Sequence, residues 1–132
     1  MNTNTTDIIL QFAQSIADYL RINKEYRAAS RNPDRRQALN HTRTQLFLLA
    51  ERDNAALHQH LNSLPEPDYI TRNARELIAC WDRRNHCFNQ LSGPKPKGWS
   101  EAPNEAIIRL NIAEKKLVDQ LKIIHTIIAK IN

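Results

Sequence analysis

The sequence has few residues that break helices. Its 132 residues include only two glycines and six prolines, and these fall in three places. The three places are Pro33; Pro65 and Pro67; and Gly93, Pro94, Pro96, Gly98 and Pro103. Proline removes a backbone donor and clashes with the preceding turn, and glycine costs helix entropy. Because apolar residues recur at helical spacing between these places, the sequence predicts four long helices joined by three connections.

Other absences exclude whole classes of protein. No apolar run approaches the roughly 20 residues that cross a bilayer, and the first residues lack the basic and apolar regions of a signal peptide. There is no Gly-rich phosphate loop, no Gly-x-Ser-x-Gly elbow and no paired-cysteine zinc spacing. Cys80 and Cys87 would lie about 10 Å apart on one helix, too far for a disulfide. We therefore expect a cytoplasmic protein with reduced thiols and without a metal site or cofactor.

The length and composition predict the architecture. With 41% hydrophobic and 25% charged residues, we expect one domain over residues 1–132. The fold class is all-α, an antiparallel up-down-up-down four-helix bundle with one long loop between helices 3 and 4. The first helix should run from Thr6, as its N-cap, to about residue 31. The second should begin at Pro33 with Asn32 as its cap, the third should cover 68–91, and the fourth should run from 104 to the C-terminus.

The third and fourth helices each carry a stripe at heptad spacing. In the third helix the stripe consists of Ile70, Ala74, Leu77, Trp81, Arg84, Phe88 and Leu91. In the fourth it consists of Ile107, Leu110, Glu114, Leu117, Leu121, Ile124, Ile128 and Ile131. Arg84 and Glu114 are the charged members of these stripes, and their positions predict a buried ion pair that fixes the register of the two helices.

The fourth helix has more apolar surface than one neighbour can cover. A second flank of Ile108, Ile112, Val118, Ile123 and Ile127 widens its stripe on both sides. A helix this apolar is central in a bundle or also supplies a contact to another subunit, and we expect both. The sequence therefore predicts a homodimer through this helix.

Positive charge is concentrated in one part of the chain. The formal net charge is +5; residues 21–43 alone carry +5, while residues 1–20 carry −2 and the remainder +2. In an antiparallel bundle, the connection at Pro33 and the connection at 92–104 lie at the same end. That end would form a basic pole made of Arg27, Arg31, Arg35, Arg36, Lys95, Lys97 and Trp99. Such a pole suits phosphates and a stacked base, or an acidic protein surface; otherwise it is a solvated end, with Trp99 folded over the bundle.

One short segment resembles a known catalytic element. Arg52-Asp-Asn-Ala-Ala-Leu-His58 is similar, over its seven residues, to the Arg-polar-x4-His element of the HEPN ribonucleases, which are small helical dimers. The resemblance implies that Arg52 would stabilise phosphate charge and that His58 would act as acid or base on an RNA backbone.

These features together predict a non-enzymatic helical interaction protein. It would be a small adaptor, chaperone or assembly subunit that self-associates and presents the basic pole to an anionic partner. The expected partner is a protein, either a second copy or another chain, and no membrane. The alternatives are a nucleic-acid-binding accessory subunit of a ribonucleoprotein and, more distantly, a HEPN-like ribonuclease.

Overall fold

The computed structural model describes residues 3–92 and 103–131. They form four helices: α1 (Thr3–Ala28), α2 (Pro33–Asn62), α3 (Tyr69–Ser92) and α4 (Pro103–Ile131). No strand occurs in either of these two ranges. The predicted all-α class with four long helices is confirmed.

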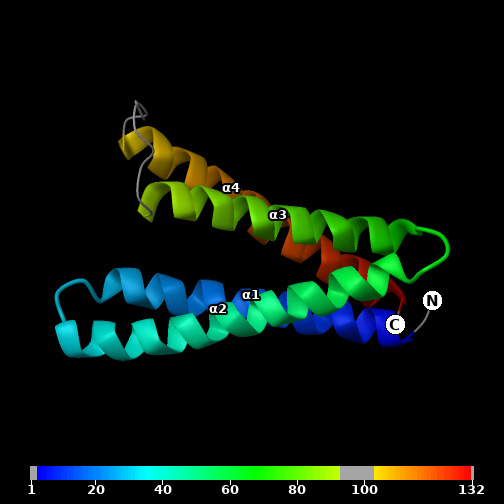
Figure 1. Cartoon of the computed structure of the whole chain (residues 1–132), viewed down its shortest axis with the longest axis horizontal. Coiled ribbons are helices and arrows are strands. Elements are labelled where there is room, and N and C mark those ends of the chain that lie inside the picture. The colour runs from blue at the N-terminus through cyan, green and yellow to red at the C-terminus, as the bar shows by residue number, and fades with distance from the viewer. Residues whose placement is uncertain (1–2, 93–102, 132) are drawn as a thin grey trace. The chain divides into compact units, whose positions relative to one another are not determined.

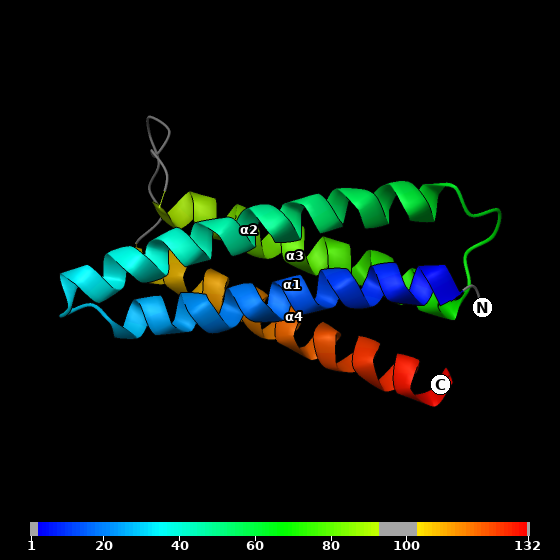
Figure 2. The same ribbon diagram turned by 90° about the horizontal axis from the view of Figure 1, so that it is seen from below.

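The chain divides into two compact units, Met1–Pro65 and Glu66–Asn132. The first unit contains α1 and α2, which pack against each other, and the second contains α3 and α4, which do the same. We call these the first hairpin and the second hairpin. Figure 1 and Figure 2 show from two sides that the helices of each hairpin run alongside one another. The single domain expected over residues 1–132 stays a prediction.

The helices of the first hairpin are antiparallel. Near the start of α1, the Thr5 Oγ1 and the His60 Nε2 atoms share a hydrogen bond of 2.7 Å. Near its end, Arg43 Nη1 donates to Asn23 Oδ1 at 3.1 Å. The partner's residue number falls as the number along α1 rises, which is the pattern of two helices that run in opposite directions.

The start of α2 has the N-cap and the first-turn proline that the sequence predicts. Asn32 has extended backbone angles (φ −127°, ψ 94°), and its Oδ1 accepts a hydrogen bond from the Arg35 N–H at 3.1 Å. Because Pro33 has no N–H, it occupies the first position of α2 without leaving a donor unsatisfied. The predicted cap at Asn32 is therefore confirmed.

The predicted bounds of the first helix are wrong at both ends. The helix begins at Thr3, so Thr6 lies inside it and is buried instead of capping it. It ends at Ala28, three residues earlier than expected. There the Ala29 N–H donates both to the Glu25 carbonyl at 3.1 Å and to the Tyr26 carbonyl at 3.2 Å. Such a shared bond tightens the last turn and leads the chain out of the helix.

In the second hairpin, α3 begins with a reciprocal cap. The Thr71 N–H donates to Asp68 Oδ1 at 2.8 Å, and the Asp68 N–H donates to Thr71 Oγ1 at 2.8 Å. Two backbone donors that the helix start would leave unpaired are thereby satisfied. The predicted stripe is buried over Ile70, Ala74, Leu77, Trp81 and Arg84. Towards the end of the helix it becomes half-buried.

Polar contacts show that α4 runs antiparallel to α3. The Gln120 side-chain amide donates to the Asn73 carbonyl at 3.0 Å. Further along α3, the Arg84 Nε lies 3.9 Å from Glu114 Oε2, and the Arg84 side chain is fully buried. The ion pair predicted from the heptad register is thus present in the structure.

The apolar residues of α4 divide between buried and exposed positions. The buried ones are Ala106, Leu110, Ala113, Leu117, Leu121, Ile124 and Ile128. The large apolar side chains left exposed are Ile107, Ile108, Ile112, Val118, Ile123 and Ile131. Ile107 and Ile131 were expected in the buried stripe, but they lie at the two ends of the helix and are exposed by almost half. None of the described helices combines the length and hydropathy that a membrane span requires.

Candidate functional site

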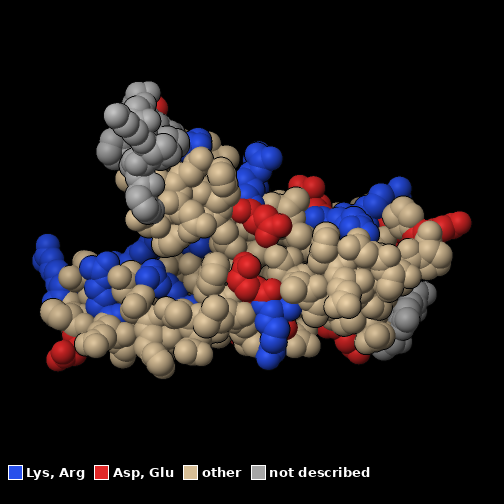
Figure 3. Space-filling model, viewed as in Figure 1, with Lys and Arg blue, Asp and Glu red and all other residues tan. Residues whose placement is uncertain are grey.

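The structure describes only part of the predicted basic pole. That part lies where α1 turns into α2 and comprises Arg27, Arg31, Arg35 and Arg36. We add Arg43 from the next turns of α2 and call this group the basic turn. Figure 3 shows basic side chains gathered over this end of the first hairpin. Lys95, Lys97 and Trp99 lie outside the described residues, so their place beside the basic turn stays a prediction.

Three members of the basic turn have exposed side chains. Arg27 lies in the last turn of α1, Arg31 in the connection, and Arg35 in the first turn of α2. A shallow hollow of about 330 Å³ lies beside two of them, Arg31 and Arg35. It is lined by Glu25, Ala28, Ala29, Arg31, Asn32 and Arg35. Two arginines and one acidic residue, Glu25, therefore border this hollow.

The other two arginines of the basic turn pack on one aromatic ring. The guanidinium carbon of Arg36 lies 4.5 Å from the centre of the Tyr26 ring, and that of Arg43 lies 3.8 Å from it. Arg43 also donates to Asn23 Oδ1 at 3.1 Å and to Asn40 Oδ1 at 2.6 Å. The cation–π contacts and the hydrogen bond to Asn23 join α1 to α2, whereas the bond to Asn40 lies within α2. Arg43, and in part Arg36, therefore stabilise the hairpin itself.

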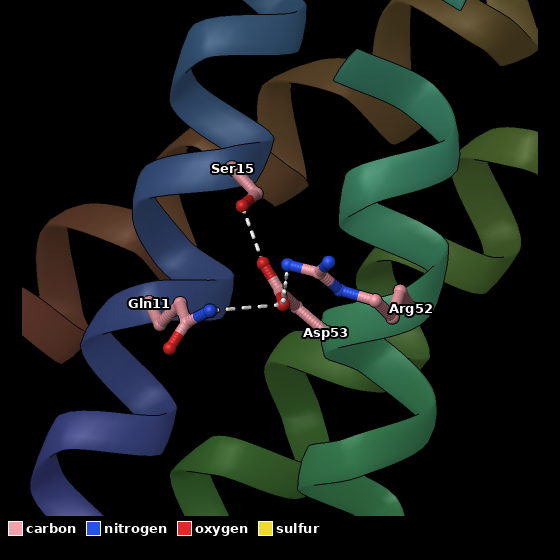
Figure 4. Close-up of polar contacts among 4 residues, drawn as sticks. All are labelled: Gln11, Ser15, Arg52 and Asp53. Atoms are coloured by element: carbon pink, nitrogen blue, oxygen red, sulfur yellow. Dashed lines mark hydrogen bonds and ion pairs between the residues drawn. The ribbon is translucent and has the colours of Figure 1, made fainter. Parts of the chain in front are cut away.

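The segment that resembles the HEPN element contributes to a structural contact (Figure 4). Arg52 is largely exposed and lies 3.7 Å from the carboxylate of Asp53, its neighbour on α2. Asp53 is buried and accepts hydrogen bonds from Ser15 Oγ at 2.5 Å and from Gln11 Nε2 at 3.3 Å. His58 is exposed on the same helix. Ser15 and Asp53 were not predicted as a pair. Each is an isolated polar residue in its own helix, and the sequence does not indicate which residues of α1 face which residues of α2.

The two cysteines are free thiols, and both are half-buried. Burial raises the pKa of the Cys80 thiol to about 11, and the nearby Glu76 carboxylate adds to this effect. The Cys80 sulfur lies 3.7 Å from Glu76 Oε1. Cys80 is therefore protonated near neutral pH and is a weak nucleophile. In the described part of the chain, no three His, Cys, Asp or Glu side chains lie together where they could hold a metal ion.

Sequence analysis missed a second concentration of basic residues. A groove of about 520 Å³ runs along the second hairpin. Its walls include Arg83 from α3 and Arg109 and Lys116 from α4, together with one acidic residue, Asp82. Ile112 and Cys87 give the groove an apolar part. The basic residues are far apart in the sequence and are interspersed with acidic ones. Only the packing of α3 against α4 brings them to one groove, so no local charge signal could have identified it.

Comparison with family models finds no match, and comparisons with curated proteins and with solved structures find no significantly similar protein.

Proposed function

We propose that this chain is a non-enzymatic helical interaction protein that binds an acidic segment of a partner protein at the basic turn and that self-associates. The observation that supports the first part best is the exposure of Arg27, Arg31 and Arg35 around one turn of the first hairpin. These residues belong to the stretch that carries the whole excess of positive charge.

Carboxylates are suitable ligands for this surface. A guanidinium group presents a planar set of donors that matches the two oxygens of a carboxylate. Arg31 and Arg35 border the hollow at the turn, so an acidic side chain bound there would have two arginines beside it, with Glu25 as the one acidic neighbour. Like charges held close together repel one another, and a bound anion relieves that repulsion.

The aromatic content of the basic turn favours a protein partner over single-stranded nucleic acid. Proteins that bind single strands combine basic grooves with exposed aromatic rings on which bases stack. Tyr26 is the one aromatic residue within 21–43, and Arg36 and Arg43 cover its ring. The alternative of nucleic-acid binding would use the basic pole together with a base stacked on Trp99, which lies outside the described residues.

Direct binding measurements test this proposal. A fluorescent glutamate-rich peptide and a single-stranded RNA of equal net charge are titrated with the protein at low and moderate salt. We expect the peptide to bind, and the variant Arg31→Ala/Arg35→Ala to bind it about tenfold more weakly. The matched control Arg72→Ala/Lys122→Ala removes the same charge from exposed positions of the second hairpin and should change affinity less than about twofold.

The outcomes separate the candidate functions. Equal losses in the two variants would show that net charge alone drives binding and would refute the role of the basic turn. Tighter binding of RNA, with a steep dependence on salt, would replace the acidic partner with a nucleic acid. RNA cleavage that disappears in the His58→Ala variant would overturn the non-enzymatic assignment.

Self-association is supported by the exposed isoleucines of α4. Exposed apolar surface on one helix face is typical of a contact with another chain. Sedimentation over a wide range of protein concentration tests this part, and a monomer mass at every concentration would refute it.

A further inference from the structure

The side of α4 next to the groove that Ile112 and Lys116 line carries four isoleucines that are not buried. Ile108, Ile112 and Ile123 are exposed by 54%, 52% and 42%, respectively, and Ile127 is half-buried. With about 100° of rotation per residue, these four positions lie within about 50° of one line along the helix. That line is about a third of a turn away from the centre of the buried side of α4. The four isoleucines therefore form a separate stripe, which we call the outer stripe.

Four charged residues complete the outer stripe. Lys116 and Asp119 lie between the two pairs of isoleucines, Glu105 precedes the first pair and Lys130 follows the second. Each of them falls within the same angular range on the helix, and none is buried. Arg109 and Thr126 lie at the two edges of this range and are not counted as members of the stripe. Asp119 also accepts a hydrogen bond from Lys115 of its own helix at 3.1 Å. This is an exposed contact between neighbouring turns, and such contacts contribute little to stability.

The outer stripe has a symmetry that a second copy can match. The steps between its successive members, from Glu105 to Lys130, are three, four, four, three, four, four and three residues, which read the same from either end. Members at equal distances from a point between residues 117 and 118 are either both isoleucine or of opposite charge. A pattern that is complementary to its own reversal is what a two-fold contact between identical helices requires. At the edges of the stripe, the symmetry-related positions are Arg109 and Thr126, a pair that is neither apolar nor of opposite charge.

We propose that two copies of this chain pair through their outer stripes, with the two α4 helices antiparallel and the two-fold axis between residues 117 and 118. This rests on the self-association in the proposed function and adds its surface, direction and register. Isoleucines then face isoleucines: Ile108 faces Ile127 of the partner subunit, and Ile112 faces Ile123 of the partner subunit. Charges are also paired, because Lys116 faces Asp119 of the partner subunit and Glu105 faces Lys130 of the partner subunit.

The charges determine the direction of pairing. In a parallel pair, Lys116 would lie beside Lys116 of the partner subunit, and Asp119 beside Asp119 of the partner subunit. Like charges in such a contact repel, whereas the antiparallel pair places each beside its opposite. The stripe spans about 37 Å of helix. It repeats after 11 residues, or about 3.67 residues per turn, so two nearly straight helices can stay in contact along its length.

Charge reversal tests the pairing. The variant Lys116→Asp places two carboxylates opposite each other at both symmetry-related contacts. The dissociation constant of the dimer, measured by sedimentation, should therefore rise at least about tenfold. Adding Asp119→Lys exchanges the two charges and should restore most of the affinity. The control Lys122→Asp makes the same change of charge on α4, about a quarter turn away from the stripe, and should leave the dimer intact.

Cross-linking tests the direction and register. In a Cys80→Ser/Cys87→Ser background, copies with Ile112→Cys are mixed with copies with Ile123→Cys and treated with a short thiol-to-thiol cross-linker. We expect a mixed product and almost none from either variant alone, since two copies of position 112 would be about 16 Å apart. These variants alter partly exposed positions, and circular dichroism serves as the control that they remain helical.

Each outcome decides the proposal. Ile112→Cys that cross-links efficiently to itself would indicate parallel helices and refute the inference. If every variant forms a dimer but the mixed Ile112→Cys/Ile123→Cys product is absent, the chain self-associates through another surface, and the pairing of the outer stripes is refuted. A monomer at all concentrations would remove both self-association and the antiparallel pair.

Discussion

The two hairpins are similar in length but differ in what joins their helices. In the first hairpin, polar contacts connect α1 to α2 along the interface, from Thr5 with His60 to Asn23 with Arg43. In the second, most buried positions of α3 and α4 are apolar, and the buried Arg84 is the charged exception. Both helix pairs bury apolar residues. The first adds several polar pairs along its interface, and the second adds one ion pair and the hydrogen bond from Gln120 to Asn73.

The comparison also shows where each hairpin has surface left for other contacts. The buried apolar residues of α2 are Ala50, Leu57 and Leu61, and its exposed surface near the turn is basic. In α4, isoleucines remain exposed beside a well-filled buried side. The first hairpin thus exposes basic side chains near its turn, and the second exposes apolar side chains on α4.

The largest effect is expected from the ion pair of the second hairpin. Glu114→Ala leaves the fully buried Arg84 without its carboxylate, which should lower the free energy of unfolding by about 3 kcal/mol. Urea unfolding followed by circular dichroism measures this change. The double variant Arg84→Met/Glu114→Leu replaces the pair with apolar groups and should be close to wild type. A mild effect of Glu114→Ala would mean that the apolar stripe alone holds the register.

A smaller loss of stability is expected when the buried carboxylate of the first hairpin is removed. Asp53→Ala removes the acceptor for Ser15 and Gln11 and should cost about 2 kcal/mol, because the buried Ser15 hydroxyl loses its partner. The control Gln59→Ala changes an exposed residue of the same helix and should cost less than about 0.5 kcal/mol. Equal unfolding curves for the two variants would show that polar pairs do not stabilise this hairpin.

The cation–π contact should contribute less again. Arg43→Ala removes the stacking on Tyr26 and the hydrogen bond to Asn23, for an expected loss of about 1 kcal/mol. Arg21→Ala, which removes an exposed arginine 3.9 Å from Asp18, serves as the control and should have almost no effect on the same urea curve. If Arg43→Ala left the urea unfolding curve equally unchanged, the contact with Tyr26 would not contribute to stability.

The smallest effect concerns the thiol of Cys80. Its pKa of about 11 lies above the ordinary value of 9.0, so the folded state favours the protonated form. That contribution to stability is fully present below pH 9 and is lost as the pH rises towards 11. In a Cys87→Ser variant, the alkylation rate of Cys80 should rise about tenfold per pH unit from pH 8 to pH 10. A rate that levels off near pH 9, as expected for the unfolded chain in urea, would contradict the raised pKa.

The sequence predicts the second hairpin more completely than the first. In α3 and α4, heptad spacing identifies most of the buried residues and the Arg84–Glu114 pair, because the charged residues occupy the same register as the apolar ones. In α1 and α2, the contact between Ser15 and Asp53 depends on how two helices align across their interface. A periodic pattern along one helix does not contain that information.

The candidate site was predictable in part for the same reason. The local charge excess identifies Arg31 and Arg35 as a basic surface, and both are exposed at the turn. It does not distinguish them from Arg36, the residue after Arg35, which packs on Tyr26. The groove beside Lys116 was missed because residues from two helices create it.

One pair of variants tests most directly whether the two hairpins serve separate contacts. Binding of a short acidic peptide and dimer mass are measured on the same samples of Arg31→Ala/Arg35→Ala and of Lys116→Asp. The first variant should lose peptide affinity and remain a dimer, whereas the second should dissociate and still bind the peptide. A variant that loses both properties would contradict the assignment of anion binding to the basic turn and self-association to α4.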